Sequence, residues 1–104
     1  AAHYQIPCLM IVCNNRSFYN DERHQGRMAV HRGRPEENRW IGLQIGDPDI
    51  DIAGMACAQG ALGIGPIAQP AELQPAIERG IAAVRSGQVC VIDARVLPGY
   101  DRGA

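Results

Sequence analysis

The stretch Cys8-Leu-Met-Ile-Val-Cys13 runs directly into Asn14-Asn15-Arg16-Ser17-Phe18-Tyr19-Asn20. Its apolar part shows no polar alternation, which is typical of a strand buried on both faces in the parallel sheet of an α/β protein. Ligands of open α/β sheets bind just beyond the carboxyl ends of the strands. The two asparagines occupy that position, so the sequence indicates a candidate ligand site there.

The residue types after the strand suit a magnesium ion and a phosphate group. An asparagine side chain offers a neutral oxygen to a hard cation such as Mg²⁺, which is often bound together with phosphates. The residues that follow predict the start of a helix, where free backbone N–H groups favour a phosphate. Asparagine pairs are also common in plain turns, because Asn tolerates left-handed backbone and bonds its own chain. Taken alone, the residues leave both interpretations open.

The segment Ile6-Pro-Cys-Leu-Met-Ile-Val-Cys-Asn-Asn15 resembles the closing half of the thiamine diphosphate signature, which begins with Gly-Asp-Gly and ends in Asn-Asn after an apolar strand. The rest of the chain resembles the C-terminal part of the pyrophosphate-binding domain in the acetolactate synthase and benzoylformate decarboxylase group. The similar segments are an apolar helix around residues 51–59, a helix around 71–85 and a strand at 88–96. The resemblance covers nearly all of the 104 residues.

This resemblance implies part of an enzyme that depends on thiamine diphosphate and Mg²⁺ and acts on 2-oxo acids by decarboxylation, carboligation or both. It implies that the side chain of Asn15 and the backbone carbonyl of Ser17 bind Mg²⁺. Phe18, Tyr19 and Asn20 would join these two residues in binding the cofactor. It implies no catalytic residue within the chain, because the activating glutamate of this family comes from another domain of a partner subunit.

The Gly-Asp-Gly half of the signature is absent from these residues. We therefore expect residues 1–104 to be the C-terminal portion of a pyrophosphate-binding domain, a fragment that is inactive by itself. Upstream domains of the same enzyme and a second subunit would complete the active site, in a homodimer or homotetramer. Two alternatives stay open. One is a non-catalytic α/β module for another phosphate-bearing ligand, and the other is an inactive structural homologue.

Composition and charge exclude several other classes of protein. The chain is 46% apolar and 20% charged, with a net charge of −1, so no general surface for nucleic acid or membrane is expected. No apolar run approaches the length that spans a bilayer, and no signal-peptide pattern is present. The four cysteines lie in apolar segments without a Cys-x-x-Cys pair. We expect them to be reduced core residues of a cytoplasmic protein: Cys8, Cys13, Cys57 and Cys90.

The remaining pattern predicts the order strand, helix, helix, strand, helix, strand, and hence a three-layer α/β/α fold with a mostly parallel sheet. We expect helices from about residue 20 to 31, at 49–59 and at 71–85, strands within 61–67 and 88–96, and a surface tail at 97–104. Ser17 or Asn20 is expected to cap the first helix. Pro75 suggests that the last helix begins later than Pro70. An apolar stripe predicts its core face: Leu73, Ile77, Ile81 and Val84.

Arginines concentrate between residues 23 and 39, and this cluster has two interpretations. It could form an anion-binding face. Four acids in the same region (Asp21, Glu22, Glu36 and Glu37) favour instead a solvated, internally paired surface. His24 and His31 share a helical face, but no carboxylate or cysteine completes a metal site with them. The arginines of the cluster are Arg23, Arg27, Arg32, Arg34 and Arg39.

Overall fold

A computed structural model describes residues 1–98, so most of the expected surface tail lies outside the described residues. The elements follow the predicted order: β1 (Leu9–Asn14), α1 (Tyr19–His31), α2 (Ile52–Ala58), β2 (Leu62–Ile67), α3 (Pro70–Arg85) and β3 (Cys90–Arg95). The chain divides into two compact units. The sheet unit holds residues 1–14 and 51–96, and the α1 unit holds residues 15–50 and the described residues after Val96.

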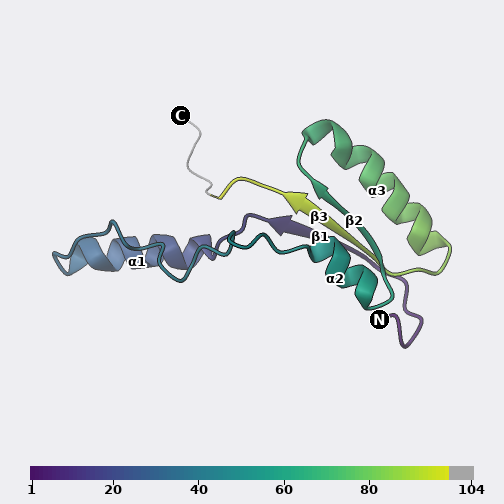
Figure 1. Ribbon diagram of the computed structural model, residues 1–104, viewed down its shortest axis with the longest axis horizontal. Coiled ribbons are helices and arrows are strands. Elements are labelled where there is room, and N and C mark those ends of the chain that lie inside the picture. The colour runs from purple at the N-terminus through teal and green to yellow at the C-terminus, as the bar shows by residue number, and fades with distance from the viewer. Residues whose placement is uncertain (99–104) are drawn as a thin grey trace. The chain divides into compact units, whose positions relative to one another are not determined.

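The sheet has the strand order β1-β3-β2, and both pairings are parallel (Figure 1). β3 lies in the centre, with Cys90 aligned to Leu9 on one side and to Leu62 on the other. The register on the β2 side shifts between Ile64 and Ile67, where Pro66 has no N–H to donate to the ladder. The predicted α/β class with a parallel sheet is confirmed.

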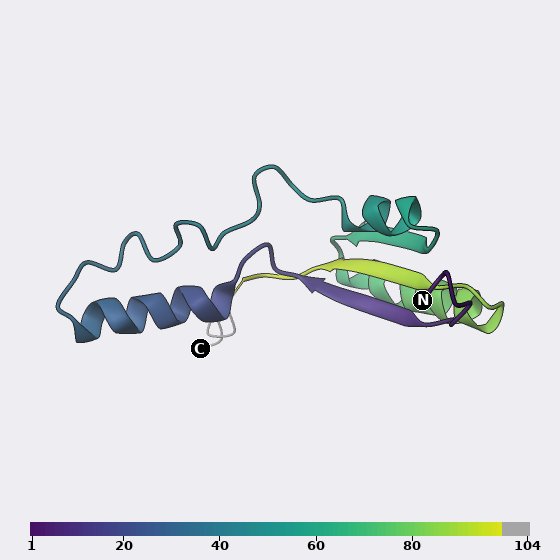
Figure 2. The same cartoon turned by 90° about the horizontal axis from the view of Figure 1, so that it is seen from below.

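Helices α2 and α3 cover opposite faces of the sheet (Figures 1 and 2). Successive residues of a strand point to opposite faces, and β2 shows this directly. The backbone of Gly63 lies against α2, where an added Cβ would overlap the carbonyl oxygen of Ala53. The next residue, Ile64, packs with Ala76 of α3 in the buried core. The three-layer arrangement follows from these two contacts.

The core lies between the sheet and α3, and small residues of the helix form its contact face. Ala76, Gly80 and Ala83 are the buried residues of α3. A Cβ on Gly80 would stand 2.7 Å from Cδ1 of Leu9, which shows how closely the helix approaches the strand. The prediction that larger apolar residues form the core face is confirmed for Ile77, which packs against the buried core. It is wrong for Ile81, which is 38% exposed.

The prediction that β1 is buried on both faces is also wrong. Met10 and Ile11 are 44% and 45% exposed, because within the described residues β1 pairs with β3 alone and forms an edge of the sheet. The most deeply buried strand is β3, in which Cys90 and Ile92 are 0% exposed. Asp93 of the same strand is 1% exposed, and its Oδ1 has no hydrogen-bond partner within residues 1–98.

The four cysteines differ in how deeply they are buried. All four thiols are free, but Cys90 is the only one that is buried. Cys8 is half-buried, whereas Cys13 on β1 and Cys57 on α2 are exposed. The expectation of four core cysteines is therefore wrong, because an apolar neighbourhood in sequence does not show on which face of a strand or helix a residue lies.

The residues that begin the three helices differ in part from the predictions. Phe18 takes the N-cap position of α1, so neither Ser17 nor Asn20 caps this helix. In α2, Oδ1 of Asp51 accepts a hydrogen bond of 2.7 Å from the backbone N–H of Gly54 and caps the helix. Helix α3 begins at Pro70 with a capping box between Gln69 and Glu72. The expected later start is wrong, and Pro75 lies inside the helix.

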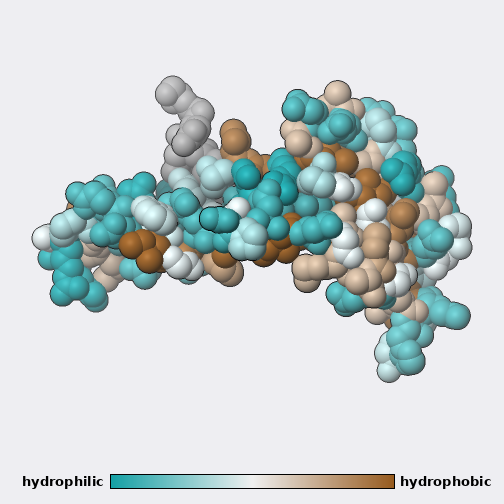
Figure 3. All heavy atoms as spheres, viewed as in Figure 1, coloured by the Kyte–Doolittle hydropathy of each residue, from teal (hydrophilic) through white to brown (hydrophobic). Residues whose placement is uncertain are grey.

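The α1 unit contains α1 and the segment after it, residues 32–50, which we call the return segment. Backbone hydrogen bonds hold the return segment to α1 at both ends of the helix. The N–H of Phe18 donates to the carbonyl of Leu43 at 2.8 Å, and the N–H of Arg34 donates to that of Ala29 at 2.9 Å. Its surface is mainly hydrophilic on the face shown in Figure 3. None of the helices within residues 1–98 has the length and apolar character needed to cross a membrane.

Candidate functional site

The two asparagines stand where the sequence places them, directly at the end of β1. The carbonyl of Asn14 accepts a hydrogen bond of 3.1 Å from the N–H of Val96, so pairing with the central strand continues to the last residue of β1. Oδ1 of Asn15 then accepts a hydrogen bond of 3.1 Å from the N–H of Ser17. Arg16 between them has a φ of +53°. Asn15 therefore bonds its own chain as a turn asparagine does, but the left-handed residue is Arg16 and neither asparagine. Oδ1 of Asn15 retains a second lone pair for a ligand.

The return segment supplies the opposite wall of this corner. Ser17 pairs with Gln44 in an isolated antiparallel bridge. The N–H of Ile45 donates to the carbonyl of Arg16 at 2.9 Å, which fixes the two segments beside each other. Gln44 was missed by sequence reasoning, because a polar loop without periodicity gives no signal for a pairing of this sequence separation.

A small hollow of about 180 Å³ lies at this corner, within the α1 unit. Two of the five predicted cofactor-binding residues, Asn15 and Ser17, line it. The other three do not: Phe18 is 55% exposed, Asn20 is an exposed residue of α1, and Tyr19 lines a different groove. The complete lining is Asn15, Arg16, Ser17, Gln44, Gly46 and Pro98.

The donor set of this Asn15 hollow suits one side of a magnesium–diphosphate group. Asn15, Ser17 and Gln44 offer neutral oxygens, which a hard cation accepts, and Arg16 brings a fixed positive charge that suits a phosphate. Mg²⁺ is usually held by one or two carboxylates as well as by phosphates. No carboxylate of the described residues lines the hollow. Residues 1–98 also contain no group of three or more His, Cys, Asp and Glu side chains that could hold a metal ion.

A hydrogen bond to Glu22 fixes the position of the Ser17 side chain. Oγ of Ser17 donates a hydrogen bond of 3.1 Å to Oε2 of Glu22, which is only 8% exposed. A carboxylate this deeply buried requires such a donor, because burying an unpaired charge is costly. From the sequence, Glu22 was expected among the acids of a solvated, internally paired surface, which is wrong for this residue because it is buried. No local signal distinguishes it from the exposed Asp21 beside it.

Comparisons with known proteins bear on the whole chain. Residues 1–94 match the family described as "Thiamine pyrophosphate enzyme, C-terminal TPP binding domain". Comparisons with curated proteins and with solved structures gave no significant match. The family match spans all six elements, including all but the last residue of β3. A match over this much of the sequence confirms the resemblance at the level of the domain, and the chain therefore belongs to the C-terminal TPP-binding domain family of thiamine pyrophosphate enzymes.

Proposed function

We propose that this chain forms one side of the magnesium–diphosphate site in a thiamine diphosphate-dependent enzyme that acts on 2-oxo acids by decarboxylation, carboligation or both. The observation that supports this most directly is the Asn15 hollow, which joins neutral oxygen donors to a guanidinium at the end of β1. In a domain of this family, a site at the end of a strand is where a phosphate-bearing ligand is expected.

In this proposal, Mg²⁺ is bound by the amide oxygen of Asn15 and the backbone carbonyl of Ser17. The guanidinium of Arg16 adds a charge-assisted contact to the diphosphate. Phe18, Tyr19 and Asn20 lie along the cofactor. The bound cofactor supplies the electron sink that 2-oxo acid chemistry needs. The role of this chain is to bind and orient it, and Glu22 keeps Ser17 in position through its 3.1 Å hydrogen bond.

The proposal includes partners, because no carboxylate of the described residues lines the hollow. Upstream domains of the same enzyme would bring the carboxylate ligand of the metal, and a second subunit would bring the acid that activates the cofactor. The assembly would be a cytoplasmic homodimer or homotetramer whose substrate is a small 2-oxo acid. Residues 1–104 alone would be inactive.

A second candidate is a non-catalytic module, either one that binds another phosphate-bearing ligand or an inactive homologue that retains only the fold. The observation in its favour is that no carboxylate of the described residues lines the Asn15 hollow. A module of this kind would use the same neutral oxygens and the same guanidinium without a complete metal site.

The intact masses in a purified sample and the thiamine diphosphate released on denaturation separate these candidates. The enzyme proposal predicts a polypeptide that carries Gly-Asp-Gly and close to one cofactor per site. Release of CO₂ from pyruvate or benzoylformate then distinguishes among substrates. A single species of 11.2 kDa without cofactor, and without cofactor binding when Mg²⁺ and thiamine diphosphate are added, would contradict it and favour the non-catalytic module.

A further inference from the structure

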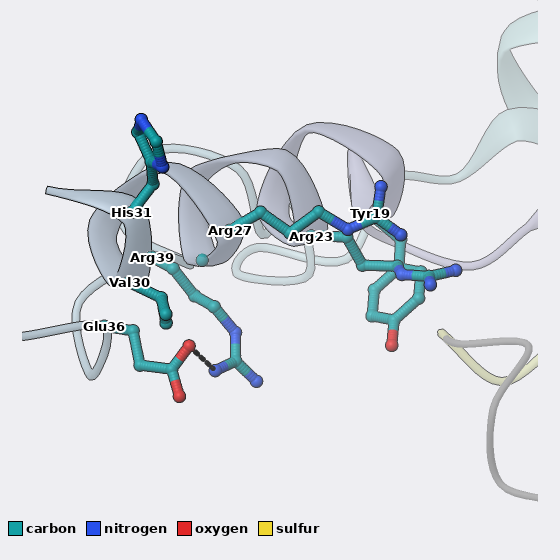
Figure 4. A pocket seen from close by; sticks show the side chains of 8 residues that line it. Tyr19, Arg23, Arg27, Val30, His31, Glu36 and Arg39 are labelled. Atoms are coloured by element: carbon teal, nitrogen blue, oxygen red, sulfur yellow. Dashed lines mark ion pairs between the residues drawn. The ribbon is translucent and has the colours of Figure 1, made fainter.

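Glu22 of α1 is a buried acid in a unit whose other acids lie at the surface. It is 8% exposed, whereas the remaining acids of residues 15–50 are exposed. Glu36, for example, forms an ion pair of 3.7 Å with Arg39, so the internally paired surface expected from the sequence is confirmed for this pair (Figure 4). The carboxylate of Glu22 is bonded differently. It accepts its hydrogen bond from the neutral hydroxyl of Ser17, and no ion pair of the described residues includes it.

A buried negative charge that is met only by a neutral hydroxyl is costly, and a cation nearby would lower that cost. Glu22 is therefore a reason to look for a positive group close to Ser17. The hydrogen bond between Oγ of Ser17 and Oε2 of Glu22 measures 3.1 Å, so the charge lies directly behind this serine.

Ser17 connects Glu22 to the Asn15 hollow. It lines the hollow, and its backbone N–H donates to Oδ1 of Asn15 at 3.1 Å. The hydrogen bonds that join this segment to the return segment belong to the carbonyl of Arg16 and the N–H of Phe18. The pairing therefore does not use the carbonyl of Ser17. Its N–H and its hydroxyl hold Ser17 in place, while the carbonyl oxygen is the group proposed to bind the metal.

The Asn15 hollow lacks the kind of ligand that Mg²⁺ usually has. One or two carboxylates commonly bind this ion, but no carboxylate of the described residues lines the hollow. Glu22 brings a full negative charge one hydrogen bond behind a lining residue. In metal sites, partners of this kind orient the ligands and make them more basic. Because the Oγ–H of Ser17 is directed to Glu22, the hydroxyl offers only its lone pairs to other groups.

We propose that Glu22 is a positioning residue of the magnesium–diphosphate site, which acts through Ser17 and supplies the negative charge that the lining of the hollow lacks. This inference rests on the proposed function, because it assigns Glu22 to the site formed by Asn15 and Ser17. Glu22 does not itself line the hollow, so it is not assigned as a metal ligand. A role in folding alone would need the hydrogen bond of Glu22 but not its charge, and this difference makes the proposal testable.

The test is a titration of the full chain with Mn²⁺ in the presence of thiamine diphosphate, in which electron paramagnetic resonance measures the free Mn²⁺. Mn²⁺ accepts the same oxygen ligands as Mg²⁺. Glu22→Gln removes the charge, while its amide oxygen can still accept the hydrogen bond from Ser17. It is expected to weaken Mn²⁺ binding roughly tenfold. The matched control is Glu37→Gln at an exposed acid of the return segment, which should leave the affinity unchanged.

A double variant tests the route through Ser17. The connection is already lost in Ser17→Ala, so adding Glu22→Gln to it should cause little further loss of Mn²⁺ affinity. Urea unfolding separates binding from folding. Glu22→Gln removes a buried charge and keeps the hydrogen bond, so it should not lower the urea midpoint. Circular dichroism verifies that each variant is folded.

The possible failures of the inference and of the proposed function are distinct. A loss of Mn²⁺ affinity in Asn15→Ala but not in Glu22→Gln would overturn the role of Glu22 and leave the proposed function standing. Unchanged affinity in Asn15→Ala, or no Mn²⁺ binding by the unmodified chain, would contradict the proposed function and the role of Glu22 with it. An equal loss in Glu37→Gln would mean a general effect of net charge, and a full further loss in the double variant would mean that Glu22 does not act through Ser17. Either result would overturn the inference.

Discussion

Replacing Gly63 with alanine tests how closely α2 packs on the sheet. The new Cβ would overlap the carbonyl oxygen of Ala53 and would come within 2.9 Å of Sγ of Cys57. The first obstacle is backbone, so relief requires a shift of α2 as a whole. Overpacking of this kind typically costs 1–3 kcal/mol, and a backbone obstacle places Gly63→Ala near the upper end. Alanine recovers about 0.5 kcal/mol of the entropy that glycine loses in a strand. The net loss of unfolding free energy should be roughly 2–3 kcal/mol.

The assay is urea unfolding followed by circular dichroism, in which stability falls linearly with denaturant. With a slope of about 1.5 kcal/mol/M, Gly63→Ala should lower the midpoint by roughly 1–2 M. Gly60→Ala is the matched control: its φ of +87° strains any side chain, but no atom lies within 4 Å of the added Cβ. It should lose only about 1 kcal/mol. A Gly63→Ala protein within about 0.5 kcal/mol of the unmodified chain would refute the close approach of α2 to β2.

Three further predictions concern single side chains. Ser17→Ala removes the donor to the buried carboxylate of Glu22 and should lower the unfolding free energy by about 1–3 kcal/mol, where an unchanged urea midpoint would speak against that bond. Asp51→Ala removes the cap of α2 and should cost about 1 kcal/mol, whereas Asp51→Asn should retain most of it. Burial raises the pKa of the Cys90 thiol above its usual range. The folded protein therefore keeps this thiol neutral at pH values where the thiol of the unfolded chain is already ionised. The stabilisation of the folded state by its neutral buried thiol is complete below the ordinary thiol pKa of about 8.5 and is lost as the pH rises through the raised pKa. A thiol reagent should modify the exposed Cys13 in the folded protein and Cys90 only on unfolding, and equal rates for the two would contradict the burial.

The order of the elements was predictable because its signals are local. Apolar runs mark the strands, whereas Pro75 misled the prediction of where α3 begins, since the helix starts at Pro70 with the capping box between Gln69 and Glu72. The parallel arrangement follows from alternating strands and helices. The resemblance around Asn14 and Asn15 identified the family, since it depends on the order of many residues and not on the asparagine pair alone.

The apolar runs do not show which strand lies at the edge of the sheet and which lies in its centre. β1 and β3 are both short and apolar, yet β1 is an edge strand and β3 is the centre. The difference arises from how the crossovers place the strands, which no single segment encodes. The small residues of the contact face of α3 were missed for a related reason. These residues, such as Gly80, are buried because they allow close approach, whereas a search for large apolar side chains selects their neighbours, such as Ile81.

At the candidate site, the structure brings Asn15 and Ser17 into one hollow, since both lie within a few residues of the end of β1, and their role in binding stays a prediction. The sequence could not supply Gln44, which reaches the corner through a bridge to Ser17 across a long polar segment. The sequence also could not show which of the arginines lies against α1. Arg39 turns across α1 because Gly26 leaves room for it, and that contact depends on the path of the return segment.

The most direct test of the central claim is the affinity of thiamine diphosphate for the full chain in the presence and absence of Mg²⁺, compared between Asn15→Ala and Asn38→Ala. Asn38 is an exposed asparagine of the return segment outside the Asn15 hollow, so its variant controls for loss of an amide elsewhere in the α1 unit. If Asn15 binds the metal of a magnesium–diphosphate group, binding should require Mg²⁺ and should weaken roughly tenfold in Asn15→Ala alone. Equal affinities in the two variants, or binding that ignores Mg²⁺, would contradict the claim.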